Sequence, residues 1–306
     1  MRVALTGATG FLGRYLVETL LADGAQLRCW MRPRSHAATP LLDHPDVEWI
    51  PGELACPSSA AQLVEGCDAL VHAALDRPGR AFQGQEGDVV EFVQKNLLGT
   101  LQLIEAARAA RVARCIIIST CAVHDRILDD RPLDETHPLW PTSHYGACKG
   151  AIEKFVHSYG YGDRYPICAV RPTGIYGLAQ PAEKSKWFGL VQAIVDNEPV
   201  VCRRGGKEVH AADVAKAVGV LLHADSIAGE CFNCYDRYVS EYDVAQIAKQ
   251  LVDSQSSIDG QPMTPKHQID TGKLRSLGMT FGGEERLVAT IRELVEAAHH
   301  RCAGRG

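Results

Sequence analysis

The sequence has no apolar run that approaches the roughly 18 residues needed by a membrane-spanning helix, and it has no excess of positive charge. Lysine and arginine number 32 against 37 aspartates and glutamates, which leaves a formal net charge of −5. A general nucleic-acid binder needs cations to neutralise phosphates, so this composition disfavours that class. We therefore expect neither a membrane nor a nucleic acid among its partners.

We expect no cleavable targeting segment at the start of the chain. Residues Met1–Thr6 lead directly into a glycine-rich turn, whereas a cleavable leader needs a longer apolar stretch. The 11 cysteines are odd in number and scattered, which favours free thiols over a disulfide framework. Together these features predict a cytoplasmic protein.

Short apolar runs alternate with helical patterns through the first half of the chain. The runs predict strands at residues 2–6, 27–31, 47–50, 69–73, 115–119 and 167–171. Between them, an apolar stripe predicts a long helix from Val90, Val93, Leu97, Leu101 and Ile104. Strands that alternate with helices pair in parallel through right-handed crossovers, and runs that are apolar throughout indicate a sheet covered on both faces. The predicted fold class is α/β, with a doubly wound parallel sheet.

The pattern changes after Pro172, where proline, glycine and lysine become frequent. Beyond this point the sequence predicts helices near residues 186–197, 212–224, 242–253 and 284–300. We expect one domain from residues 1–171 plus about 205–237. A smaller, mainly C-terminal α/β lobe would take about 172–204 plus 238–306.

A glycine-rich turn, T-G-A-T-G-F-L-G, occupies Thr6–Gly13 between the first predicted strand and the first predicted helix. Gly7 permits a tight turn, Gly10 lets a diphosphate approach the backbone, and Gly13 lets helix and strand pack closely. The helix N-terminus then offers N–H groups and partial positive charge to phosphate. A glycine loop without a ligand is the alternative, but the strand–turn–helix context favours dinucleotide binding.

The end of the second strand bears on the type of cofactor. An acidic residue there would accept a hydrogen bond from the ribose 2′-hydroxyl of NAD. This chain has Met31 followed by Arg32, and Arg34 two residues later, which could pair with the 2′-phosphate of NADP. The alternative is that these arginines are ordinary surface residues. We expect NADP, with NAD as the alternative.

A catalytic arrangement is suggested by Tyr145 and Lys149, which lie four residues apart on one face of a predicted helix. Tyrosine is a poor base at neutral pH because its pKa is about 10, and a neighbouring ammonium lowers that pKa. Ser119 and Thr120 end the preceding strand, where ligands bind in open parallel sheets. A hydroxyl there could hold a substrate oxygen beside the tyrosine, which would exchange a proton with it.

These parts together resemble the extended short-chain dehydrogenase/reductases, the NAD-dependent epimerase/dehydratase family. The resemblance covers nearly the whole chain and implies a Rossmann-type sheet domain and a substrate-binding lobe. The matching segments are Thr6–Gly13, V-H-A-A at Val71–Ala74, N-L-L-G-T at Asn96–Thr100, S-T-C-A-V at Ser119–Val123, Y-G-A-C-K at Tyr145–Lys149, R-P-T-G-I-Y-G at Arg171–Gly177 and V-H-A-A-D-V at Val209–Val214.

The resemblance assigns roles to individual residues. It implies that Tyr145 is the acid/base, that Lys149 holds the nicotinamide ribose and lowers the pKa of Tyr145, and that Thr120 is the catalytic hydroxyl. Asn96 would brace the wall of the active site. The implied cofactor contacts are Gly7, Thr9, Gly10, Phe11, Leu12, Gly13, Arg32, Arg34, Glu53, Leu54, Ala73, Ala74, Asn96, Ser119, Tyr145, Lys149 and Pro172.

Departures from the family pattern narrow the expected reaction. Sugar-nucleotide 4,6-dehydratases carry an Asp-Glu pair after the threonine, where this chain has Cys121 and Ala122. Thr173 and Gly174 stand where many sugar-nucleotide members have an asparagine that contacts the substrate diphosphate. We therefore expect net hydride transfer at a secondary alcohol or ketone of a small-molecule substrate. The alternatives are a nucleotide-sugar epimerase that retains its NAD and a non-catalytic NAD(P)-sensing regulator.

Two further expectations concern metals and association. Cys231 and Cys234 form a C-x-x-C pair, but a zinc site needs two more ligands at suitable spacing. We therefore expect no metal. The helix around Val90–Ala110 and the Tyr145 helix are candidates for an intermolecular four-helix bundle, as in many family members, so we expect a homodimer.

Overall fold

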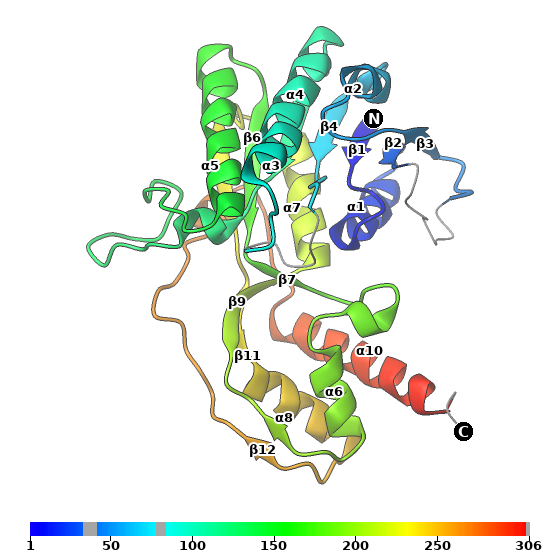
Figure 1. The fold of residues 1–306 in the computed structure, drawn as a ribbon, viewed down its shortest axis with the longest axis vertical. Helices are drawn as coiled ribbons and strands as arrows, with labels where there is room; N and C mark the ends of the chain where they lie inside the picture. Colours follow the sequence, from blue (N-terminus) through cyan, green and yellow to red (C-terminus); the bar gives the residue numbers. More distant parts are fainter. Residues whose placement is uncertain (33–41, 78–83, 304–306) are drawn as a thin grey trace. The chain divides into compact units, whose positions relative to one another are not determined.

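The computed structural model describes residues 1–32, 42–77 and 84–303 (Figure 1). These residues form two compact units. The first comprises Met1–Pro172, Val214–Cys234 and Ile269–Met279, and the second comprises Thr173–Asp213, Tyr235–Gln268 and the chain from Thr280. Among the described residues, no helix combines the length and apolarity needed to cross a membrane.

The first unit contains a seven-stranded sheet in the order β10-β6-β5-β4-β1-β2-β3, with all neighbours parallel. The strands are β1 (Arg2–Thr6), β2 (Gln26–Met31), β3 (Val47–Pro51), β4 (Ala69–His72), β5 (Arg114–Ile118), β6 (Ile167–Pro172) and β10 (Glu230–Cys234). This confirms the predicted α/β fold class. Strand order changes direction on either side of β1, so the carboxyl ends of β1 and β4 open a site for ligands.

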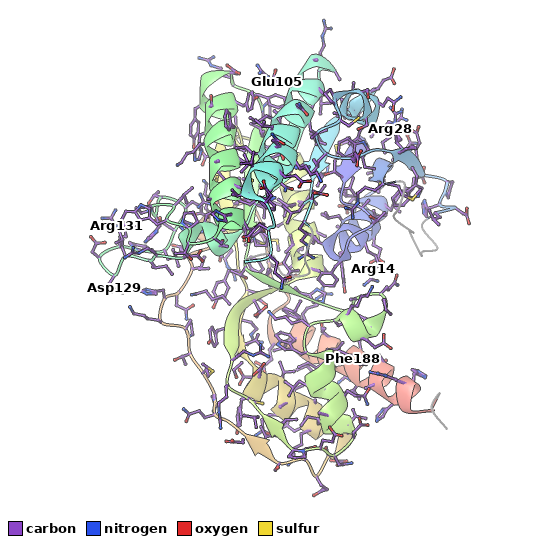
Figure 2. The ribbon with its side chains drawn as sticks, in the orientation of Figure 1. Arg14, Arg28, Glu105, Asp129, Arg131 and Phe188 are labelled. Atoms are coloured by element: carbon purple, nitrogen blue, oxygen red, sulfur yellow. The ribbon has the colours of Figure 1, made fainter. Side chains whose placement is uncertain are left out.

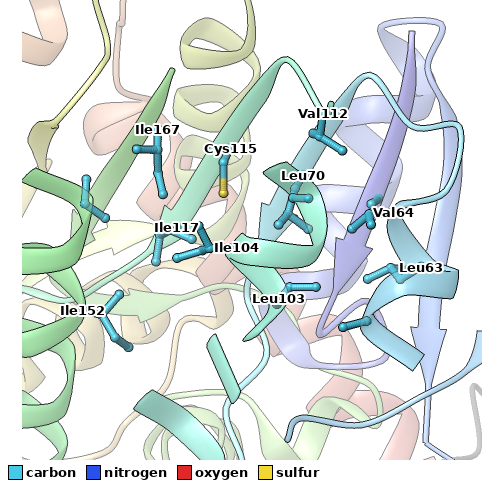
Figure 3. Packing of buried hydrophobic residues seen from close by; sticks show 14 of the residues in the cluster. Leu63, Val64, Leu70, Leu103, Ile104, Val112, Cys115, Ile117, Ile152 and Ile167 are labelled. Atoms are coloured by element: carbon cyan, nitrogen blue, oxygen red, sulfur yellow. The ribbon is translucent and has the colours of Figure 1, made fainter. Parts of the chain in front are cut away.

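The main helices of the first unit are α1 (Phe11–Ala22), α2 (Pro57–Val64), α3 (Val89–Val93), α4 (Gly99–Ala109), α5 (His144–His157), α7 (Ala211–His223), which enters the unit at Val214, and α9 (Gly272–Ser276). Helices α2, α4 and α5 lie side by side along one face of the sheet (Figure 1). Figure 3 shows Leu63, Leu103 and Ile152 from these helices packed over Leu70 and Ile117 of the strands. Their burial anchors the helices whose ends carry the site.

The long helix between β4 and β5 contains a π-helical turn, η1 (Gln94–Leu98), between α3 and α4. The predicted apolar stripe is wrong at Val90, which is 61% exposed, while Phe92, Asn96 and Thr100 are buried. A π turn holds more residues than an α turn and therefore rotates the buried face. The prediction assumed one regular helix, so it holds at Ile104 and fails at the other end.

The second unit contains two small sheets. Strands β7 (Gly174–Tyr176), β9 (Gly205–His210) and β11 (Arg237–Ser240) form one, with β11 antiparallel to β9 and β7 parallel to it. Strands β8 (Val200–Val201) and β12 (Ile258–Asp259) form the other. Helices α6 (Phe188–Val195), α8 (Glu241–Val252) and α10 (Gly283–Ala303) pack on one another around a separate apolar cluster.

The four helices expected after Pro172 are confirmed as α6, α7, α8 and α10. The short strands of the second unit were not predicted, because segments of two to six residues with part of their surface exposed carry little periodicity. Strand β9 belongs to the second unit, and residues Ile269–Met279 belong to the first.

Candidate active site

The glycine turn connects β1 to α1 in the conformation that its sequence suggests. Gly7 has φ +76, and a Cβ on it would lie 2.7 Å from the Ala73 carbonyl carbon. A Cβ on Gly13 would lie 2.0 Å from the carbonyl oxygen of Gly7. Only glycine fits these two positions. Gly10 is exposed at the N-cap of α1, and its N–H donates to Gly7 at 2.9 Å. This turn fits the diphosphate of a dinucleotide, because backbone N–H groups at the helix start are open to a ligand.

The glycine turn is tied to the end of β4 by a chain of hydrogen bonds. Thr6 Oγ1 accepts the N–H groups of Ala73 and Ala74 and lies 2.7 Å from His72 Nδ1. His72 Nε2 lies 2.9 Å from Thr100 Oγ1, which itself donates to the Asn96 carbonyl. Each donor and acceptor in this chain has a partner when His72 is neutral and carries its proton on Nε2. Burial lowers the pKa of His72 to about 3, which favours this neutral form. The predicted cofactor residues Ala73 and Ala74 are thereby fixed beside the turn.

The predicted adenosine end of the cofactor site is an exposed charge cluster. Arg32 follows β2, and its Nη1 lies 3.8 Å from Asp76 Oδ1. Lys95 Nζ lies 3.2 Å from the other oxygen of Asp76. Glu53 is exposed beyond the end of β3, and Leu54 is partly buried. The predicted contact Arg34 lies outside the described residues.

Asn96 holds the loop that follows β4. Its side-chain oxygen accepts the Asp76 N–H at 2.8 Å, and its Nδ2 donates to the Asp76 carbonyl at 2.8 Å. Nδ2 also donates to the carbonyl of Phe92 in α3, at 3.0 Å. These contacts form a clamp, in which the Asn96 side chain holds backbone groups of Asp76 and Phe92.

Thr120 and Tyr145 meet at the carboxyl end of β5. Their side chains are hydrogen-bonded to each other. Thr120 Oγ1 also accepts the Ala122 N–H at 3.1 Å, so the hydroxyl proton is available to the tyrosine oxygen. Lys149 is buried one helical turn beyond Tyr145, and its Nζ donates to the Ile118 carbonyl at 2.7 Å. The three predicted catalytic residues therefore lie together.

Burial sets the protonation of this group. Burial raises the pKa of Tyr145, while the Thr120 hydrogen bond and the positive charge of Arg77 oppose that rise. Burial lowers the pKa of Lys149 to about 8. The phenol is consequently protonated at neutral pH in the free protein, which suits donation of a proton to a substrate oxygen.

A buried polar network supports the far side of the catalytic helix. Glu153 Oε1 accepts from Ser119 Oγ at 2.5 Å and from Arg171 Nε at 3.0 Å. Glu153 Oε2 accepts from Arg171 Nη2 at 2.8 Å, so the pair is bidentate. Arg171 Nη1 lies 3.2 Å from His124 Nε2. The predicted cofactor residue Ser119 thus directs its hydroxyl to Glu153, and Pro172 is buried at the end of β6.

Sequence reasoning missed this network. Glu153 and Arg171 are almost fully buried, and both bonds to Glu153 raise the pKa of Arg171 although burial alone would lower it. Burial and the Arg171 charge lower the pKa of His124 to about 4. One signal was present, because Tyr145, Lys149 and Glu153 recur every four residues and share a helix face. Their partner from β6 could not be identified without the tertiary structure.

The family model for the NAD dependent epimerase/dehydratase family matches residues 3–234. The chain belongs to this family. It is an NAD(P)-dependent enzyme of the epimerase, dehydratase and dehydrogenase group. The glycine turn, the Thr120–Tyr145 pair and Lys149 all fall within the matched residues.

Two curated relatives show the breadth of reactions within the epimerase/dehydratase family. The chain is 36% identical over 187 residues to a 4-hydroxy-2-methyl-3-oxo-4-farnesyl-3,4-dihydroquinoline-1-oxide ketoreductase of Stigmatella aurantiaca, covering 60% of this chain and 52% of the relative. It is 29% identical over 271 residues to a mouse (Mus musculus) dTDP-D-glucose 4,6-dehydratase, covering 82% of this chain and 72% of the relative. The chain thus spans about half the length of the ketoreductase.

Solved structures share the fold. A UDP-glucuronic acid 4-epimerase from Bacillus cereus, in complex with UDP-glucuronic acid and NAD, matches with a TM-score of 0.79 and 19% identity. The match covers 98% of this chain and 99% of the epimerase. At this identity the likeness concerns the fold.

Proposed function

We propose that the chain is a ketoreductase or alcohol dehydrogenase that exchanges free NAD(P), with Tyr145 as its acid/base. The observation that carries this proposal is the buried hydrogen bond between Tyr145 and Thr120 at the carboxyl end of β5. Lys149 lies on the same helix face one turn later. These groups can bind one substrate oxygen and exchange one proton with it.

The reaction follows from the positions of these groups. A bound nicotinamide supplies or accepts the hydride at the substrate carbon. Thr120 and Tyr145 donate hydrogen bonds to the ketone oxygen, and Tyr145 gives up its proton as that oxygen becomes a hydroxyl. In the reverse direction the phenolate removes the alcohol proton. Lys149 would hold the nicotinamide ribose, as the resemblance to the epimerase/dehydratase family implies.

The residues after Thr120 argue against elimination of water. Cys121 and Ala122 lie in the short helix η2 (Cys121–His124), and both are partly buried. Cys121 Sγ donates to the Arg171 carbonyl at 3.0 Å. Neither side chain carries a carboxyl group, so the Asp-Glu pair of the 4,6-dehydratases has no counterpart at these two positions. This supports net hydride transfer over dehydration.

We propose NADP as the preferred cofactor. Arg32 lies directly after β2, where a 2′-phosphate would lie in this fold. A guanidinium can give that phosphate two parallel hydrogen bonds. The pair with Asp76 at 3.8 Å is long and exposed, so a bound phosphate can replace it.

We propose a two-fold homodimer through the α3–α4 and α5 helices. Val90 on α3, Leu98 at the π turn and Phe155 on α5 are 61%, 48% and 39% exposed. Exposed apolar side chains on adjacent helices suit a four-helix interface with a second copy. Light scattering at micromolar concentration should give twice the chain mass, and a monomeric mass would contradict the proposal.

The central experiment measures turnover of NADPH and NADH with a panel of ketones. Tyr145→Phe should lower the rate by about 10²–10⁴-fold, because it removes only the proton-transferring hydroxyl. Binding of NADPH should change little. The matched control is Tyr161→Phe, which removes a hydroxyl that binds Glu230 at the protein surface and should keep the wild-type rate.

Each outcome separates the alternatives. A Tyr145→Phe rate above about a tenth of wild type would remove proton transfer from this residue. Cofactor that stays bound through dialysis, together with sugar-nucleotide epimerisation, would favour the epimerase. Reversible NADPH binding without turnover on any carbonyl would favour the regulator.

A further inference from the structure

Helix α5, which carries the catalytic tyrosine, begins at a tight contact with η2. A Cβ on Gly146 would lie 2.6 Å from the carbonyl oxygen of Ala122, so a side chain at this position would collide with that oxygen. Ala122 stands two residues after Thr120. The backbone next to Tyr145 therefore rests on the segment that carries Thr120. A movement at the start of α5 would consequently change the hydrogen bond between the two catalytic side chains.

The first N–H groups of α5 have no carbonyl partner within the helix, so side chains bind them instead. Ser143, the N-cap residue, accepts the N–H of Gly146 at 3.1 Å. An acidic side chain three residues after the N-cap is common in helices, but Gly146 supplies none. The N–H of Tyr145 is donated to Oε1 of Glu86, at 3.1 Å. Glu86 precedes Tyr145 by 59 residues, so the catalytic helix receives its acidic cap from a distant segment.

Glu86 is a buried acid in an otherwise exposed stretch of chain. Within the described residues 84–88, its side chain is 8% exposed, whereas the other four residues are exposed. Gly84 and Gly87 have φ +74 and φ +75, a left-handed backbone that favours glycine. The chain thus turns on both sides of the acid, and the side chain between these turns reaches the start of α5.

The carboxylate of Glu86 is held in its charged form. Burial would raise the pKa of Glu86, but hydrogen bonds from backbone groups of Glu86, Tyr145 and Gly84 together outweigh burial and lower that pKa below its ordinary value. The partial positive charge at a helix N-terminus stabilises a carboxylate in the same sense. The carboxylate therefore remains an acceptor for the Tyr145 N–H at neutral and alkaline pH.

We propose that Glu86 is a positioning residue of this active site, whose bond to the Tyr145 N–H fixes the start of α5 so that the phenol stays against Thr120. Glu86 contacts the tyrosine through its backbone, so it acts on the reaction only through the position of the phenol. This role rests on the proposed function, because proton transfer requires the phenol within hydrogen-bond reach of the substrate oxygen. A displacement of about 1 Å can lower a rate by about 10²-fold.

The test compares substitutions that remove the acceptor with one that keeps it. Glu86→Ala should lower kcat for ketone reduction by roughly 10- to 100-fold and leave the Kd of NADPH nearly unchanged. Glu86→Gln retains an oxygen acceptor without the charge and should recover most of the rate. Glu86→Asp retains the charge on a shorter side chain, which withdraws the acceptor, and should also lower kcat.

The matched control is an acidic cap from the same segment. Asp88 accepts the Glu91 N–H at 2.9 Å and caps α3, a helix that carries none of the proposed catalytic residues. Asp88→Ala removes the same kind of bond and should keep the wild-type kcat. Urea denaturation of each variant checks that it is folded.

A second measurement needs no substrate. Tyrosine labelled with ¹³C at Cζ reports the surroundings of each phenol by NMR, and Tyr145→Phe identifies the Tyr145 signal. The signal should move in Glu86→Ala, because this change frees the backbone of the tyrosine. It should keep its wild-type position in Glu86→Gln and in Asp88→Ala.

The outcomes separate the positioning role from the proposed function. An unmoved Tyr145 signal in Glu86→Ala, or an equal loss of kcat in Asp88→Ala, overturns the inference. So does a signal that moves equally in Glu86→Gln, since the charge would then be responsible. Ketone reduction that keeps its wild-type kcat in Glu86→Ala contradicts the role of Glu86 and leaves the proposed function intact. A signal that moves as expected in a protein that reduces no ketone supports Glu86 and contradicts the proposed function.

Discussion

The two ends of the candidate site in the first unit are built in different ways. At the catalytic end, Tyr145 and Lys149 are less than a tenth exposed and are hydrogen-bonded within the protein. At the expected adenosine end, the side chains of Arg32 and Lys95 are 58% and 41% exposed and share one carboxylate. Burial fixes the side chains at the catalytic end, whereas the cofactor choice proposed for the other end would depend on charges that can rearrange in water.

The difference has an energetic basis. Exposed ion pairs contribute about 0–1 kcal/mol, since water and salt screen them. Removal of one partner from a buried pair costs about 3–5 kcal/mol, because it leaves a charge without compensation. Substitutions at the two ends should therefore differ in kind: the buried end should lose stability, and the exposed end should change ligand preference while the fold is maintained.

The largest effect is expected at Glu153. Glu153→Gln removes the negative charge that faces the buried Arg171 and should lower the free energy of unfolding by about 3–5 kcal/mol. Urea denaturation measures this change. The matched control is Glu105→Gln on α4 (Figure 2), where Glu105 pairs with Arg108 at 2.9 Å and the two side chains are 56% and 33% exposed. The control should lose less than about 1 kcal/mol, and equal losses would contradict the contrast between the two ends.

The next effect concerns Arg32. Arg32→Ala should weaken NADPH binding by roughly ten- to over a hundredfold, the equivalent of about 1.5–3 kcal/mol for a charge-assisted hydrogen bond. Binding of NADH should stay nearly constant, because it lacks the 2′-phosphate. Fluorescence titration of both cofactors measures the ratio, with Arg131→Ala as a control on general charge. Equal affinities in the wild type would show that Arg32 does not recognise the cofactor.

An effect that is absent at neutral pH and develops only in acid is expected at His72. Its folded-state pKa of about 3 lies below the ordinary 6.5, so the unfolded chain binds more protons between these values. The contribution of neutral His72 to the free energy of unfolding is fully present above pH 6.5. It falls as pH drops toward 3, by about 1.4 kcal/mol per pH unit below pH 6. His72→Gln should flatten the acid side of the stability curve by this amount. His299→Gln, at an exposed site on α10, should leave the slope unchanged, and an unaltered slope in His72→Gln would contradict the assignment.

Much of the first unit could be predicted from sequence because its signals are local. Several strands contain apolar runs, as in Cys115–Ile118 of β5, and the glycines of the turn and the pair Tyr145 and Lys149 stand at short, fixed spacings. The Glu153–Arg171 pair could not be predicted, since its members come from α5 and β6 and meet only when β6 pairs with β5. Arg77 lies in a loop whose path depends on a side chain from another helix.

The second unit illustrates the opposite case. Lys186 and Glu208 form a pair in which Glu208 is buried, and burial raises the pKa of Glu208 to about 7. A Cβ on Gly174 would lie 2.6 Å from the same carboxylate. Neither contact has a sequence spacing that would indicate it, because three separate segments meet there. The sequence consequently predicted helices in this unit but no specific contacts.

The Asn96 clamp fixes the path of the loop after β4 through the backbone groups of Asp76. The bonds to Asp76 use only backbone groups, so they do not depend on which side chain residue 76 or 77 carries. A library that varies position 77 alone would therefore sample new side chains on an unchanged backbone.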